Sequence, residues 1–131
     1  MNIEHVAIYV NNLEVVKNFF VKYFGAKPSE KYTNFRQDFS SYFLVFDNGS
    51  RFEIMHRSTM IDPKKAKYRS GYHHVALNVG GKKDVDELTA KIEDDGFFVV
   101  AAPRTTGDGY YASIVTDPEG NEIELLAGNV N

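Results

Sequence analysis

The chain contains no cysteine. It can therefore form no disulfide, and it has no thiolate that could act as a nucleophile or as a metal ligand. Any metal ion would have to be held by histidine, carboxylate or water. A chain without disulfides suits a reducing compartment, and we expect a cytoplasmic protein.

The sequence also lacks an excess of charge and any long apolar run. The 15 Lys and Arg residues nearly balance the 18 Asp and Glu residues, giving a net charge of −3. This charge gives no support for a nucleic-acid or anionic-membrane partner. No segment is long and apolar enough to predict a transmembrane helix, and the first residues lack the basic end and apolar stretch of a signal peptide. At 131 residues, the chain is expected to be a single domain.

Two copies of one pattern run through the chain. Residues 5–10 (HVAIYV) return 69 residues later as residues 74–79 (HVALNV). Residues 49–55 (GSRFEIM) return 71 residues later as residues 120–126 (GNEIELL), and Gly25 corresponds to Gly96 with the same offset. Because the same features recur in one order and at nearly one spacing, we predict two modules. They cover residues 1–58 and 71–128, joined by a polar linker at about 58–70, within one domain of residues 1–131.

Hydrophobic periodicity predicts a strand, a helix and three further strands in each module. In the first module, apolar residues alternate over residues 5–10 and then recur at helical spacing up to Gly25. Further strands are predicted in the first module near 31–35, 40–46 and 50–57, and in the second near 72–79, 97–102, 109–116 and 121–127, with a helix from Val85 to Gly96. The expected fold class is α+β: two βαβββ modules forming a curved eight-stranded mixed sheet with helices on its outer face.

Alternation along the strands places one histidine and one glutamate of each module on the face away from the helix. They are His5 and Glu53 in the first module, and His74 and Glu124 in the second. Together they predict a His₂Glu₂ set that suits one divalent ion such as Zn, Ni, Co, Mn or Fe(II). Such an ion keeps positions open for substrate oxygens, and a ligand carboxylate can act as a base.

The other two histidines receive a structural interpretation. Alternation places His56 and His73 on the helix side, where partial exposure or a backbone hydrogen bond would account for them.

The motifs at residues 5–10, 19–25, 74–77 and 117–125 resemble those of the vicinal oxygen chelate superfamily, the glyoxalase I, bleomycin-resistance and dioxygenase group. The resemblance covers residues 2–127. It implies His5, His74 and Glu124 as metal ligands, with Glu53 at the position that varies among members. The His/Glu/His/Glu pattern is similar to that of nickel- or zinc-dependent glyoxalase I (lactoylglutathione lyase). This similarity implies a lyase or isomerase that forms an enediolate from a small carbonyl or hemithioacetal, with Glu124 or Glu53 moving the proton.

Two positions depart from the glutathione-dependent members. Tyr9 stands where those members have an arginine, and Arg57 where they tend to have an asparagine. Tyrosine removes a charge-assisted bond to a substrate carboxylate. The thiol partner could therefore differ from glutathione, or the reaction could be an epimerisation. Tyr9, Arg57 and Met55 are the candidate substrate contacts, although ordinary cavity lining explains Tyr9 and Arg57 equally well.

Other functions of the same superfamily stay open. Bleomycin-resistance-like relatives are non-catalytic dimeric binding proteins that generally lack the metal set, and the intact His₂Glu₂ set argues against that function here. An Fe(II) dioxygenase would use two histidines and one carboxylate, and Glu53 would fill a position that dioxygen needs. A fosfomycin-type thiol transferase ranks low, because no phosphonate-binding signature is visible. We expect a homodimer in which one chain, or two partner chains, complete each metal site.

Overall fold

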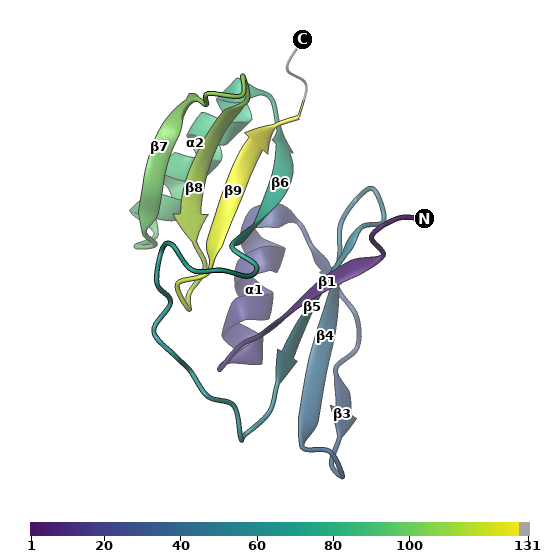
Figure 1. The fold of residues 1–131 in the computed structure, drawn as a ribbon. Helices are drawn as coiled ribbons and strands as arrows, with labels where there is room; N and C mark the ends of the chain where they lie inside the picture. Colours follow the sequence, from purple (N-terminus) through teal and green to yellow (C-terminus); the bar gives the residue numbers. More distant parts are fainter. Residues whose placement is uncertain (129–131) are drawn as a thin grey trace. The chain divides into compact units, whose positions relative to one another are not determined.

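The computed structural model describes residues 1–128, and the chain divides into two compact units (Figure 1). The first unit is Met1–Lys64, and the second begins at Lys65. Each unit contains one copy of the internal repeat and one complete set of strands around one helix. Over residues 1–128, no helix is long and apolar enough to cross a membrane.

The first unit is a five-stranded mixed sheet with one helix. Its elements are β1 (His5–Tyr9), α1 (Leu13–Phe24), β2 (Lys27–Pro28), β3 (Tyr32–Asn34), β4 (Phe39–Val45) and β5 (Arg51–His56). The strand order is β1-β5-β4-β2, and β3 also pairs with β4. Strands β1 and β5 are parallel, whereas the other pairs are antiparallel. Helix α1 begins where the Asn12 side chain accepts a hydrogen bond from the Val15 amide (3.1 Å), and it ends at Gly25, whose φ of 64° favours glycine.

The second unit repeats this plan with four strands. Its elements are β6 (His74–Gly80), α2 (Lys82–Asp94), β7 (Val99–Thr105), β8 (Tyr111–Thr116) and β9 (Glu122–Ala127). The order is β6-β9-β8-β7, with β6 and β9 parallel. At the start of α2, the Asp84 carboxylate accepts a hydrogen bond from the Gly81 amide at 2.7 Å. Each sheet therefore ends in a parallel pair that joins the first and last strands of its module.

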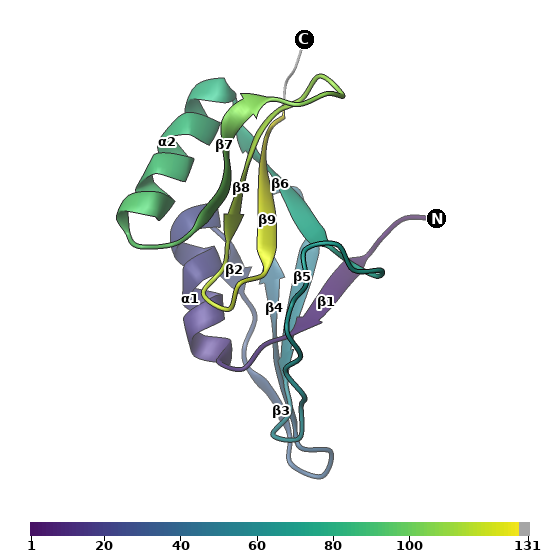
Figure 2. The same cartoon turned by 60° about the vertical axis from the view of Figure 1, so that its left-hand side comes forward.

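Each helix covers one face of its own sheet and forms the core there (Figures 1 and 2). In the first unit, Phe20 of α1 packs on Phe52 of β5 with ring centroids 5.5 Å apart. The fully buried side chains on these faces include Val16, Phe20, Leu44 and Ile54 in the first unit, and Val85, Ile92, Val115, Ile123 and Leu125 in the second. The strand residues between them are left to the opposite, helix-free face of each sheet, as the alternation predicts.

The α+β class and the βαβββ modules are confirmed. Over the described residues, however, the strands form two sheets rather than the single eight-stranded sheet that we expected. Periodicity identifies strands but carries no information on which strands pair. The first sheet also gains a strand, because its edge splits into β2 and β3 around Ser29. There, the Ser29 amide donates to the Phe43 carbonyl (2.8 Å) and its hydroxyl accepts from the Phe43 amide (2.9 Å).

Candidate functional site

In the first unit, the register between β1 and β5 brings His5 close to Glu53. His5 is opposite Arg51, and Ala7 is opposite Glu53. The side chains of His5 and Glu53 are therefore diagonal neighbours on the helix-free face. His5 Nε2 lies 3.7 Å from Glu53 Oε1. The His5 side chain is 38% exposed and that of Glu53 is 14% exposed. This pair is thus partly shielded from water but accessible to a ligand.

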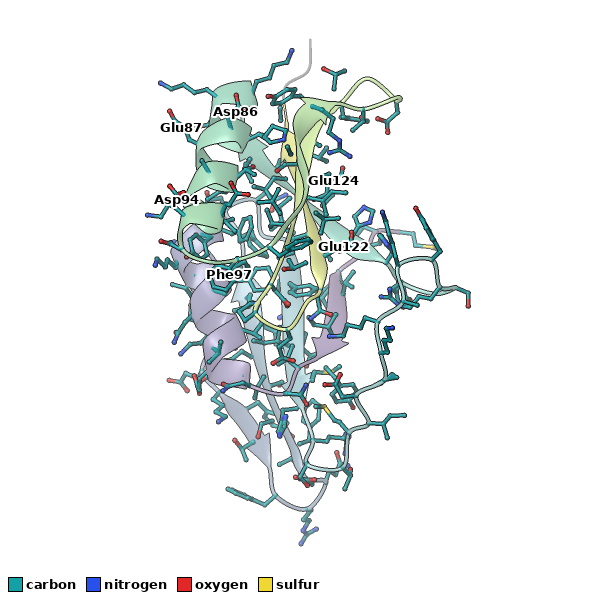
Figure 3. The ribbon with its side chains drawn as sticks, turned by 90° about the vertical axis from the view of Figure 1, so that its left-hand side faces the viewer. Asp86, Glu87, Asp94, Phe97, Glu122 and Glu124 are labelled. Atoms are coloured by element: carbon teal, nitrogen blue, oxygen red, sulfur yellow. The ribbon has the colours of Figure 1, made fainter. Side chains whose placement is uncertain are left out.

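The second unit reproduces this arrangement between β6 and β9. His74 is opposite Glu122 and Ala76 is opposite Glu124, which is the register of the first unit transferred through the repeat. His74 Nε2 lies 3.6 Å from Glu124 Oε2. Figure 3 shows Glu122 and Glu124 on β9, on the side of the sheet away from α2. The strand pairs β1–β5 and β6–β9 therefore each hold an imidazole and a carboxylate at nearly the same distance.

These distances suit two donors of one metal ion. Ligand atoms about 2.1 Å from a common ion are about 3.0 Å apart at a right angle and about 3.4 Å apart at the tetrahedral angle. The separations of 3.7 and 3.6 Å come within a few tenths of an ångström of the tetrahedral value and are larger than the right-angle value. They are too long for a hydrogen bond between the imidazole and the carboxylate. Neither Nε2 therefore donates a hydrogen bond to its neighbouring glutamate.

Each unit supplies one such pair and no larger cluster. Over the part of each unit that the structure describes, no three His, Asp or Glu side chains come together in a way that could hold a metal ion. One imidazole and one carboxylate in each unit match the chemistry of a site for a borderline divalent ion.

The other ring nitrogen of His5 contacts Glu4. His5 Nδ1 lies 3.1 Å from Glu4 Oε1. Arg51 donates from Nε to Glu4 Oε2 at 2.8 Å, and its Nη2 contacts Glu4 Oε1. These hydrogen bonds, from Arg51 first and His5 second, lower the pKa of Glu4 from 4.5 to about 2. Phe43 lies beside both bases, with the Arg51 guanidinium 4.0 Å from its ring centre and the His5 ring edge-on at 5.3 Å.

In the second unit, the other ring nitrogen of His74 contacts His73. The two Nδ1 atoms are 2.8 Å apart, and the rings are nearly perpendicular at 87°. His73 Nε2 lies 3.5 Å from Glu122 Oε2. In each unit, the residue that precedes the predicted ligand histidine therefore contacts the Nδ1 atom of that histidine. The same preceding residue also contacts a charged side chain of the neighbouring strand.

The three candidate substrate contacts lie together on the helix-free face of the first sheet. Tyr9 and Met55 are opposite each other in the β1–β5 register. Arg57 donates from Nε to the Tyr9 hydroxyl at 3.0 Å and from Nη1 to the Gln37 carbonyl at 2.6 Å. Its guanidinium also lies 5.1 Å from the centre of the Phe39 ring. The chain thus brings a cation from the residue that follows β5 to the side chain of Tyr9.

The two remaining histidines, His56 and His73, make different contacts. His56 Nδ1 lies 2.9 Å from the Val10 carbonyl, which is the backbone hydrogen bond that we expected. His73 is partly exposed, as expected, but it precedes β6, so the alternation that placed it on the helix side does not extend to it. Sequence reasoning also missed Glu4. The repeat contained a signal for both, since residue 4 corresponds to residue 73.

The chain matches a known family model and is similar to a curated protein. The family model described as "Glyoxalase/Bleomycin resistance protein/Dioxygenase superfamily" matches residues 2–125. Among curated proteins, the chain is similar to the uncharacterized protein YqjT of Bacillus subtilis (strain 168). The two are 28% identical over 132 residues, which cover 94% of this chain and 96% of that protein.

Solved structures share the fold at low sequence identity. A glyoxylase/bleomycin resistance protein/dioxygenase domain from Frankia sp. EAN1pec has a TM-score of 0.83 at 15% identity, covering 98% of this chain and 93% of that one. The trypanothione-dependent glyoxalase I of Leishmania major has a TM-score of 0.76 at 22% identity, covering 97% and 86%. Lactoylglutathione lyase from Agrobacterium tumefaciens has a TM-score of 0.70 at 21% identity, covering 97% and 93%. At these identities the likeness shows the fold alone.

Proposed function

Because the chain belongs to the glyoxalase/bleomycin resistance protein/dioxygenase superfamily, we propose that it is a metal-dependent lyase or isomerase of the glyoxalase type. Its substrate would be a small carbonyl compound or hemithioacetal that reacts through an enediolate. The observation that carries the proposal is the repetition of one His–Glu pair. The register is the same in both units, and the distances are 3.7 and 3.6 Å.

The proposed ligands of the ion are His5, Glu53, His74 and Glu124. Nickel or zinc fits two imidazoles and two carboxylates best, and cobalt, manganese or iron are the next candidates. When bound, a divalent ion would polarise a substrate carbonyl as a Lewis acid. We propose a cytoplasmic homodimer, in which both pairs of one site come either from one chain or from two partners.

The carboxylates of Glu124 and Glu53 are the proposed proton carriers. In a hemithioacetal next to a carbonyl, one of them would accept the proton of the carbon that carries the hydroxyl and the sulfur. The same carboxyl would then return the proton to the adjacent carbon, the former carbonyl carbon. One C–H bond breaks and another forms, and the hydroxyl proton passes to the former carbonyl oxygen. The hemithioacetal therefore becomes a 2-hydroxyacyl thioester without any oxidant or reductant. General base catalysis by a positioned carboxylate contributes about 10²- to 10⁴-fold to such a rate.

Arg57, Tyr9 and Met55 are the proposed contacts for the remote end of the substrate. Arg57 uses only part of its donor set on Tyr9 and Gln37, so it can still bind an anionic group. Arg57 lies four positions after Glu53, a span of about 13 Å along extended backbone. The geometry favours a substrate whose carboxylate or other anion is at about this distance from the reacting carbonyl.

A second candidate is a non-catalytic small-molecule-binding protein. The observation in its favour is that neither unit, over its described residues, assembles three metal-binding side chains by itself. Turnover distinguishes the two functions. We would strip the protein with a chelator, restore Ni, Zn or Co singly, and follow thioester formation from hemithioacetals of several thiols. Metal-restored turnover supports the enzyme, whereas substrate binding without turnover for any metal and thiol would favour the binding protein.

A further inference from the structure

Glu4 and His73 occupy equivalent positions of the repeat, and each contacts the Nδ1 atom of the histidine that follows it. We infer that they are positioning residues: they hold His5 and His74 in the tautomer whose proton is on Nδ1 and whose lone pair is on Nε2. This inference rests on the proposed metal site, because an imidazole can bind an ion only through a nitrogen without a proton.

In the first unit, the chemistry of the partner decides the tautomer. A carboxylate can only accept a hydrogen bond, so the contact between Glu4 Oε1 and His5 Nδ1 at 3.1 Å requires the proton on Nδ1. Arg51 holds this carboxylate through both of its oxygens. Glu53, at 3.7 Å from Nε2, is too far away to compete for the proton by a hydrogen bond. The neutral His5 ring is therefore left with a free lone pair on Nε2.

In the second unit, the contact between the two histidines takes its direction from the repeat. Neither carboxylate decides the tautomers by a hydrogen bond, because Glu122 Oε2 lies 3.5 Å from His73 Nε2 and Glu124 Oε2 lies 3.6 Å from His74 Nε2. The equivalent contact in the first unit has residue 4 as the acceptor, so we assign the acceptor here to His73 Nδ1, which takes the Nδ1 proton of His74 across 2.8 Å. With its proton on Nδ1, His74 presents a lone pair at Nε2. The opposite assignment would put a proton on His74 Nε2 and prevent metal binding.

The repeat strengthens the assignment. Residues 4 and 73 correspond to each other, and so do residues 51 and 122. The first unit pairs an acid with a base at these positions, Glu4 with Arg51, whereas the second pairs a base with an acid, His73 with Glu122. The order of acid and base is reversed, but in the assignment above both pairs place an acceptor at the Nδ1 atom of the next histidine. Packing alone does not require this complementarity at partly exposed positions.

Residues of this kind orient a ligand without touching the ion, and their loss typically lowers metal affinity by about 10- to 100-fold. We therefore expect Glu4→Ala and His73→Ala to weaken Zn²⁺ binding by about this factor. Glu4→Gln and His73→Asn each keep an oxygen that can accept the Nδ1 proton, so they should stay within a few-fold of the wild type. Glu30→Ala, which removes an exposed carboxylate of the first unit, is the control for lost charge.

The test combines calorimetric titration of Zn²⁺ with ¹⁵N NMR of the imidazoles in the metal-free protein, at a pH where histidine is neutral. In the wild type, the expected spectrum shows protonated Nδ1 and unprotonated Nε2 in both His5 and His74. In the alanine variants this preference should weaken, while the backbone resonances should still be those of the folded protein. A proton on Nε2 in the wild type would overturn the inference, as would alanine variants with unchanged affinity. A wild type that binds no Zn²⁺ would refute the proposed metal site instead, since the tautomers are read without metal.

Discussion

His74 Nε2 lies 3.6 Å from Glu124 Oε2 across two parallel strands, and the repeat places His5 and Glu53 in the same relationship in the other unit. The parallel pairing of the first and last strand of each module makes this possible. It brings together two residues about fifty positions apart in the sequence, on the face that the helix leaves free. Packing does not require either pair, because the core lies on the opposite face.

We expect Glu124→Gln to reduce kcat by at least about 100-fold while Zn²⁺ affinity falls much less. Glutamine keeps an oxygen ligand but cannot accept a proton from carbon. Steady-state kinetics and calorimetry on the same preparation measure the two effects. If Glu53→Gln shows the large loss of kcat and Glu124→Gln does not, the proton carrier is Glu53. If neither variant loses activity, no ligand carboxylate moves the proton.

Arg57→Ala should raise KM for an anionic substrate about tenfold or more and leave kcat nearly unchanged. The guanidinium would bind a remote group equally in the ground state and the transition state. Tyr9→Phe should have a smaller effect in the same direction, because it removes only the hydroxyl that accepts the Arg57 Nε hydrogen bond. Arg36→Ala, which removes another cation of the same unit, should leave KM unchanged. An equal rise in KM for Arg36→Ala would assign the effect to overall charge.

Phe20→Ala should lower the free energy of unfolding by about 3–5 kcal/mol, because it leaves a cavity against Phe52 beneath α1. Phe20 is 1% exposed. Phe35 is 91% exposed, so Phe35→Ala should change the stability by less than about 0.5 kcal/mol. Urea denaturation of the two variants compares the same substitution inside and outside the core. Similar losses would mean that α1 does not bury Phe20 as described.

Asp117 should make the stability fall as the pH rises. Burial raises the pKa of this carboxyl above its ordinary value of 3.8, although the Glu119 and Asn121 amides and the Asn121 side chain donate hydrogen bonds to it. The folded state then binds the proton more tightly than the unfolded state, so this contribution is complete below pH 3.8 and is lost as the pH passes the raised value.

Urea titrations from pH 3.5 to pH 7 would measure this contribution as the difference between the wild type and Asp117→Asn, which has no titrating group at this position. The stability of the wild type relative to Asp117→Asn should decline across that range. A difference that stays constant or grows with pH would contradict the raised pKa.

The sequence predicts the helix-free faces well because alternation along a strand is a local property. The burial of Phe52 and Ile54, with Glu53 between them only partly buried, follows directly from it. The internal repeat then identifies the equivalent residues in the second unit. Both steps need only the spacing of residues along the chain, which explains their success.

What the sequence could not predict depends on contacts between segments or just outside the strands. His73 precedes β6, so the period of two does not apply to it, and its contact with His74 arises from the approach to the strand. The bond from Arg57 to Tyr9 depends on the reach of a long side chain across the β1–β5 pair. The separation of the strands into two sheets depends on pairing, which periodicity leaves undetermined.

The most direct test of the central claim is a calorimetric titration of chelator-stripped protein with Zn²⁺ and with Ni²⁺. His5→Ala, Glu53→Ala, His74→Ala and Glu124→Ala are measured beside it. The control is His56→Ala, because the His56 ring hydrogen bonds to the Val10 backbone carbonyl and His56 is not one of the proposed ligands. We predict tight binding of one ion per chain in the wild type and in His56→Ala, and a large loss of affinity in each of the four other variants. No binding in the wild type, or binding that survives removal of either histidine of the set, would contradict the metal site.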